Sequence, residues 1–264
     1  MQLNMQDRKE CIVKLYDSLI EELKELLPSD PEIYAYDEND IWQESQEFEL
    51  ILQKETAYEL GERGCESVNY TLITTNQELV PSDQVTVYGP DLQELTGAAS
   101  YARISLAVIR DKEEWEHDSE KLYKVIGDID FVKYHVFPKG YMLRCSARTH
   151  REQVRVSKES LEAGMTFSHI GNTIIKHMKE NPNVLAVNEI FVTAESANYK
   201  DLIQSAAKAA AIRRSLSVLN KGMPTECGTC DIREICNDVE GLRELHFGQN
   251  KERKKQDTHI KLSV

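Results

Sequence analysis

The feature that most constrains the fold is a change of pattern at Gly61. After it come short runs rich in β-branched and aromatic residues, each bounded by turn residues, as is typical of strands. These runs are Val68–Thr75, Gln84–Tyr88, Ala102–Arg110, Tyr141–Ala147, Gln153–Val156 and Val184–Thr193. Helical patterns lie between and after them, at residues 113–126, 158–163, 168–180 and 198–220. This order predicts an α+β fold, with mixed sheet layers packed against helices, rather than a regular βαβ repeat.

The N-terminal part has a different character. Apolar residues recur there at intervals of three and four, namely Ile12, Leu15, Leu19, Leu23 and Leu26. This spacing predicts one amphipathic helix over residues 4–27, which Pro28 ends. The residues from Ile33 to Tyr36 look extended, and we expect a connector and a further helix between them and Leu60. Residues 1–60 carry five basic and sixteen acidic side chains, so this helical extension is strongly acidic.

Charge and hydropathy exclude several classes of function. The net charge of −13 argues against general nucleic-acid binding, which needs a surplus of Lys and Arg on one face. No apolar run approaches the ~18 residues of a membrane span, and the N-terminus does not resemble a signal peptide. We therefore expect a cytoplasmic protein without membrane or nucleic-acid partners.

Three of the six cysteines, Cys227, Cys230 and Cys236, lie within ten residues. A C-x-x-C turn directs two thiolates at one metal, and the third cysteine adds a ligand. Such closely spaced sets suit a [4Fe–4S] cluster, with zinc as the alternative. A redox pair and plain thiols remain open, and the fourth cluster ligand is unknown, with Cys145 or Cys65 as candidates.

The chain is expected to have four parts. They are an acidic helical extension (1–57), an α+β domain (58–221), a helical Cys-rich metal segment (222–248) and a disordered basic tail (249–264).

Several segments of the α+β domain carry a resemblance to a known family. They are Tyr58–Gly61, Ser67–Tyr70, Val85–Leu92, Gly97–Tyr101, Arg155–Gly164 and His169–Gly171. In order and spacing they resemble the middle region of acetyl-CoA synthase, the β-type subunit of the carbon monoxide dehydrogenase/acetyl-CoA synthase complex. The resemblance extends from about residue 45 to residue 236 and suggests a stand-alone, truncated homologue.

This resemblance implies anaerobic metabolism of carbon monoxide and corrinoid-bound methyl groups. In the family, a [4Fe–4S] unit joined to a dinickel site follows the region, and its cysteines begin with C-x-x-C, as Cys227 and Cys230 do. The sequence contains no Cys-Gly-Cys tripeptide, which holds the distal nickel in the family. Whether the chain is an enzyme is therefore left open.

The resemblance also implies coenzyme A as a ligand. The family is thought to receive it through arginines around a tryptophan, and Arg144, Arg148, Arg151 and Arg155 lie within twelve residues here. Guanidinium groups suit its phosphates, but Gln153 stands where the tryptophan is expected. On a strand, Arg151 and Arg155 would share one face, while scattered surface arginines are the other interpretation.

Three hypotheses follow. In the first, the chain is an iron–sulfur protein for electron transfer, reductive activation or docking, beside a corrinoid protein, a methyltransferase or a carbon monoxide dehydrogenase-type partner. In the second, acetyl or methyl groups are transferred to coenzyme A at a metal centre completed by a partner. In the third, the chain is a non-catalytic adaptor braced by zinc. A heteromeric assembly would suit each of them.

Overall fold

The computed structural model describes residues 5–111 and 119–221. Its helices are α1 (Met5–Leu26), α3 (Ser119–Phe131), α4 (Lys158–Glu162), α5 (Phe167–Lys179) and α6 (Tyr199–Lys221). Its strands are β1 (Glu32–Ala35), β2 (Thr56–Leu60), β3 (Ser67–Thr74), β4 (Gln84–Tyr88), β5 (Tyr101–Ile109), β6 (Tyr141–Cys145), β7 (Glu152–Ser157) and β8 (Val184–Val192). Two 3₁₀ turns, η1 (Gln53–Glu55) and η2 (Val132–Tyr134), complete the set.

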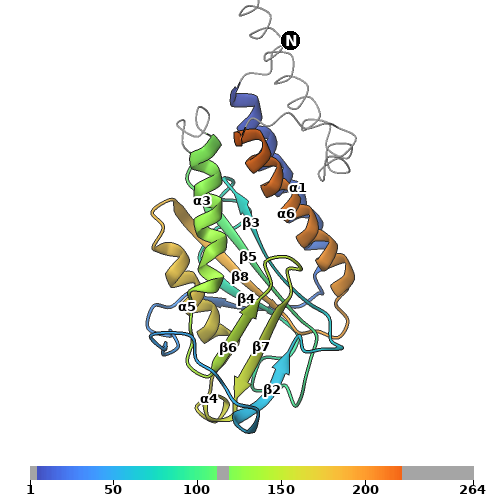
Figure 1. The fold of residues 1–264 in the computed structure, drawn as a ribbon, viewed down its shortest axis with the longest axis vertical. Helices are drawn as coiled ribbons and strands as arrows, with labels where there is room; N and C mark the ends of the chain where they lie inside the picture. Colours follow the sequence, from blue (N-terminus) through green and yellow to red (C-terminus); the bar gives the residue numbers. More distant parts are fainter. Residues whose placement is uncertain (1–4, 112–118, 222–264) are drawn as a thin grey trace, which may run out of the picture.

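The fold is α+β, as the sequence predicted, and contains two sheets (Figure 1). The larger sheet has the strand order β1-β4-β8-β5-β3 and the smaller one β2-β7-β6. The large sheet is mixed, because β5 pairs parallel with β3 and antiparallel with β8. Every residue of β5 is buried, so this strand forms the centre of the core.

Helix α5 packs on β4 and β8 at close range. A side chain at Gly171 would meet the Val85 side chain at 2.4 Å, so the helix reaches this distance only with glycine at that position. The helix starts at a Thr166 cap, whose hydroxyl accepts a hydrogen bond from the His169 amide.

Helices α1 and α6 lie side by side and pack on β3 (Figure 1). Leu19, Ile20 and Leu23 of α1 are buried in the same core as Leu202 and Ala206 of α6. At the surface Lys208 Nζ lies 2.6 Å from Glu22 Oε2. The first 57 residues thus contribute a helix, and through β1 an edge strand, to the core of the following domain. No helix among the described residues is long and apolar enough to cross a bilayer.

The prediction of a helix between Tyr36 and Leu60 is wrong. Apart from the turn η1, residues 37–55 form an irregular segment. Trp42 explains this, because its indole donates to the Lys139 carbonyl and its backbone amide to the Thr173 hydroxyl. These contacts with distant parts of the chain replace the internal hydrogen bonds of a helix.

The helix expected at residues 113–126 ends five residues later than expected. Its described part, α3, continues to Phe131, whereas residues 112–118 lie outside the described residues. Leu122, Ile126 and Ile129 are buried, so the apolar face continues beyond the expected end.

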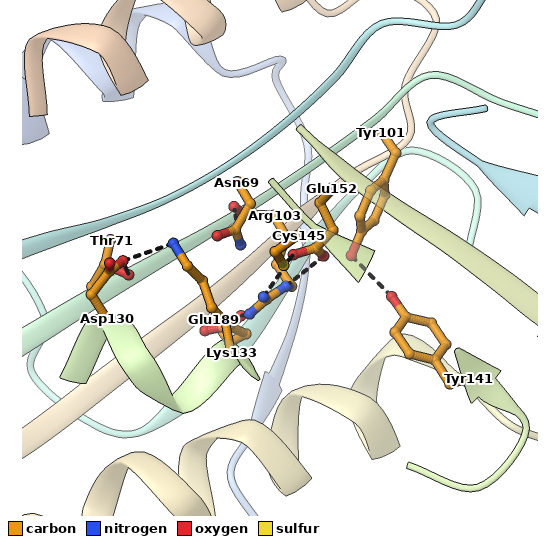
Figure 2. Close-up of polar contacts among 10 residues, drawn as sticks. All are labelled: Asn69, Thr71, Tyr101, Arg103, Asp130, Lys133, Tyr141, Cys145, Glu152 and Glu189. Carbon is orange, nitrogen blue, oxygen red and sulfur yellow. Dashed lines mark hydrogen bonds and ion pairs between the residues drawn. The ribbon is translucent and has the colours of Figure 1, made fainter. Parts of the chain in front are cut away.

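A buried group of charges joins the two sheets (Figure 2). Arg103 of β5 donates from Nε and Nη2 to both carboxylate oxygens of Glu152 in β7, at 2.7 and 2.8 Å. Its Nη1 donates to Glu189 of β8 at 2.7 Å, and all three side chains are fully buried. Burial raises the pKa of Glu189. We call these three residues the Arg103 cluster.

Replacing Arg103 should destabilise the whole domain. The variant Arg103→Met leaves two buried carboxylates without a cation, which costs about 3–5 kcal/mol. Urea unfolding followed by circular dichroism measures the loss. The control is Arg110→Met at the exposed end of the same strand, which removes one hydrogen bond to the Pro182 carbonyl and should cost about 1 kcal/mol or less. Equal unfolding midpoints for the two variants would contradict the assigned role.

Candidate functional site

The hairpin formed by β6 and β7 carries the arginines that the sequence singled out. Its loop, residues 146–151, is closed by hydrogen bonds from Ser146 N to Arg151 O and from His150 N to Ser146 O, at 2.8 and 2.9 Å. His150 has a φ of 54°, in the left-handed region that side chains rarely adopt, and its carbonyl accepts from the Asn69 amide of β3. The loop therefore has a fixed shape against the large sheet.

Two of the four arginines are engaged within the protein. Arg155 binds Glu59 of β2, with Nη2 2.6 Å from Oε1, and donates to the Ile51 carbonyl at 2.8 Å. Arg151 donates from Nη2 to the carbonyls of Gly61, Glu62 and Cys65, at 3.0 to 3.1 Å. It precedes β7 by one residue, so the expected shared strand face with Arg155 does not form.

The other two arginines form no ion pair with a described residue, and they line different pockets. Within the described part of the chain, Arg144 makes only a long contact with the Met142 sulfur, at 3.8 Å. Arg148 makes no hydrogen bond or ion pair with any described residue. The four arginines therefore do not converge on one point, and the loop that carries them borders two separate pockets.

The first pocket, which we call the arginine pocket, has a volume of about 340 Å³. Its lining includes Arg63, Arg144 and Arg151 together with the hydroxyl residues Ser146 and Thr149, and no acidic residue. Guanidinium groups and hydroxyls in this combination favour phosphate or carboxylate groups. The sequence reasoning missed Arg63, although its position between Gly61 and Gly64 placed it in a surface turn.

Gly61 shapes the wall of this pocket. It has a φ of 64°, and a side chain there would lie 2.5 Å from the Glu152 carbonyl oxygen and 2.6 Å from Ser67. Only glycine allows the turn to approach β7 so closely. Gln153, the residue at the expected tryptophan position, also lines the pocket and donates to Glu59 at 3.1 Å.

Cys145 borders the arginine pocket, and its thiol is bound to a buried carboxylate. Its Sγ donates to Glu152 Oε2 at 3.0 Å, which connects it to the Arg103 cluster (Figure 2). Burial, followed by the nearby Glu152 charge, raises its pKa far above the usual range. The protonated thiol is therefore the favoured form of Cys145 in this structure.

The second pocket, which we call the aromatic pocket, has a volume of about 680 Å³ and includes Arg148 in its lining. At its base Asp130 accepts from Lys133 Nζ at 2.8 Å and also binds Arg213. Burial acts to raise the pKa of Asp130, but the charges of Lys133 and Arg213 lower it overall. Its carboxylate therefore stays ionised and orients both cations.

The cysteines expected to bind metal, Cys227, Cys230 and Cys236, lie outside the described residues. Among residues 5–111 and 119–221 there is no group of three or more His, Cys, Asp or Glu side chains that could hold a metal ion. Metal binding by the cysteine segment remains a prediction.

A family profile described as the CO dehydrogenase/acetyl-CoA synthase complex beta subunit matches residues 43–198, more than half of the chain. No curated protein matches the sequence. The matched stretch contains β2 to β8 with both arginine-bearing strands, while α1, β1, α6 and the three clustered cysteines lie outside it.

The engaged and free arginines should behave differently when they are replaced. Arg151→Ala removes the donor to three carbonyls and should lower the free energy of unfolding by about 1–2 kcal/mol. Arg144→Ala, from the same pocket, should change it by less than about 0.5 kcal/mol. Chemical unfolding of both variants tests this, and an Arg151→Ala protein as stable as the Arg144→Ala protein would disprove the bracing role.

Proposed function

Because the chain belongs to the family of the CO dehydrogenase/acetyl-CoA synthase complex beta subunit, we propose that it is an iron–sulfur protein of one-carbon metabolism related to acetyl-CoA synthase. In this proposal Cys227, Cys230 and Cys236 hold a [4Fe–4S] cluster. The protein transfers electrons to, reductively activates or docks with a corrinoid protein, a methyltransferase or a carbon monoxide dehydrogenase-type partner. It acts in the cytoplasm, where thiols stay reduced.

The observation that carries the proposal is the position of the C-x-x-C sequence directly after α6. Cys227 follows Lys221, the last residue of α6, by six positions. Helix α6 is fixed on the core through Leu202, Ala206 and Ile212, which are buried. The cysteine segment therefore follows directly on a helix that is packed on the family-matched domain through its first part, an arrangement that suits a cluster presented to a partner.

The residue types limit the chemistry that a cluster would supply. A [4Fe–4S] cluster held by cysteines carries single electrons, and its potential depends on hydrogen bonds and solvent exposure. The dinickel site of acetyl-CoA synthase needs a Cys-Gly-Cys tripeptide, which this sequence lacks. Electron transfer or activation thus fits the residues present better than acetyl transfer by this chain alone.

Metal analysis of anaerobically purified protein tests this proposal. We expect iron and acid-labile sulfide, about four of each per chain, and their loss in the double variant Cys227→Ser/Cys230→Ser. Cys11→Ser, in α1, is the matched control and should keep its iron. Zinc without iron would instead support a braced adaptor, and protein that takes up no iron on anaerobic reconstitution would refute the proposal.

A second candidate function, coenzyme A binding, is favoured by the arginine pocket. Arg63 and Arg144 have their guanidinium groups free of ion pairs with any described residue, next to Arg151, whose position is fixed by three carbonyls. Such a set can bind the phosphates of coenzyme A without first breaking internal salt bridges. A metal centre completed by a partner would then be needed for group transfer.

Coenzyme A binding should depend on the arginine pocket. The double variant Arg63→Ala/Arg144→Ala should weaken binding by about tenfold or more, because each charge-assisted hydrogen bond contributes about 1.5–3 kcal/mol. Isothermal titration calorimetry measures the dissociation constant. Arg110→Ala, an exposed arginine outside both pockets, should leave it unchanged. Wild-type protein that does not bind coenzyme A, or a double variant that binds it normally, would exclude this function.

A further inference from the structure

The aromatic pocket is lined by residues from two parts of the chain, one inside and one outside the family-matched stretch. Its lining combines residues of the family-matched stretch, from β3, α3, η2 and the β6–β7 loop, with residues of α1 and α6. The two helices lie outside the matched stretch. The pocket therefore needs residues from both inside and outside the matched stretch. Its volume of about 680 Å³ lies in the range of small-molecule sites, ~300–1,000 Å³.

The charges of this pocket are opposite in sign to those of the whole protein. Four basic residues line it, Lys133, Arg148, Arg213 and Arg214, against the single carboxylate of Asp130. The chain as a whole has a net charge of −13. A local surplus of positive charge in an acidic protein attracts anions to one place.

The basic residues divide into two layers. Lys133 and Arg213 are bound to Asp130, and Lys133 is 8% exposed, so these two cations are fixed at the base (Figure 2 shows Lys133 and Asp130). Arg148 and Arg214 are exposed and form no hydrogen bond or ion pair within the described part of the chain. They can therefore contact a ligand without breaking a salt bridge to any described residue.

The remaining walls are aromatic. Five aromatic residues line the pocket: Tyr16, Tyr70, Tyr123, Phe131 and Tyr134. Phe131 is 55% exposed, although its ring contacts Tyr134 and His135. An exposed aromatic ring at the edge of a basic pocket offers a face on which another flat ring can stack.

We propose that the aromatic pocket binds a nucleoside phosphate. The nucleobase packs against Phe131, and the phosphates pair with Arg148 and Arg214. The two fixed cations, Lys133 and Arg213, lie behind the phosphates at the bottom of the pocket. A ligand that stacks on Phe131 needs a flat ring, and a ligand that pairs with the arginines needs negative charge. A nucleoside di- or triphosphate has both. This site shares no residue with the arginine pocket or the cysteine segment, so it does not depend on the proposed function.

Calorimetric titration of the full chain with ATP tests the proposal, with inorganic pyrophosphate and coenzyme A as comparison ligands. We expect ATP to bind and the double variant Arg148→Ala/Arg214→Ala to weaken it by about tenfold or more. The matched control Arg63→Ala/Arg144→Ala should bind ATP as the wild type does. All four positions are exposed, and circular dichroism confirms that the variants fold.

A second pair of variants tests the aromatic part. Phe131→Ala should weaken ATP binding by about fivefold or more and leave pyrophosphate binding unchanged, because stacking involves only the base. Phe48→Ala removes an aromatic ring that is 47% exposed elsewhere and is the control.

Four results would overturn the proposal. They are no binding of ATP, equal affinity for pyrophosphate and ATP, ATP binding that survives in Arg148→Ala/Arg214→Ala, and ATP binding lost in Arg63→Ala/Arg144→Ala. The last would place the nucleotide in the arginine pocket. Coenzyme A itself contains an adenosine diphosphate unit. If its binding is lost in Arg148→Ala/Arg214→Ala and kept in Arg63→Ala/Arg144→Ala, the second candidate function fails and this inference stands.

Discussion

The Arg103 cluster is the interaction on which the arrangement of the two sheets depends. One guanidinium group uses three hydrogen bonds to bind a carboxylate on a neighbouring strand and another on the second sheet. A buried ion pair of this kind adds little stability compared with apolar packing, but removal of one partner is costly. Its main effect is geometric, because it sets the position of β7 relative to β5. The arginines of the β6–β7 hairpin, and the parts of both pockets that the hairpin lines, take their places from this contact.

The sequence predicted regular elements well and long-range contacts poorly. The strands other than β2, and the helices α1 and α5, follow from local patterns of β-branched, aromatic and apolar residues, and the structure has them within two residues of the expected ends. Strand β2 lies where a helix was expected. The segment around Trp42 was misjudged because its hydrogen-bond partners, Lys139 and Thr173, are about 100 residues or more away along the chain. Arg103 lay inside an apolar run, where nothing local indicated a buried cation with two carboxylates.

The candidate sites show the same limit. Charge density predicted an arginine-rich region, and the hairpin does carry one, but pattern alone could not separate structural arginines from free ones. Arg151 and Arg155 are held by carbonyls and by Glu59, which come from elsewhere in the sequence. Arg63 and Arg214 became candidates only when the fold placed them beside Arg144 and Arg148, respectively. The cysteine segment, in contrast, can be interpreted from spacing, since its presumed ligands are close along the chain.

The aromatic pocket has one wall from α1 and another from α6, the first and last helices that the structure describes. Contacts between such distant parts of a chain require a long loop to close and form slowly in folding. The cavity therefore exists only once both ends of the domain have docked. A molecule that occupies it adds its binding free energy to that closure, and so to the stability of the whole domain. In such a protein, the amount of folded material in the cell would rise and fall with the supply of the small molecule.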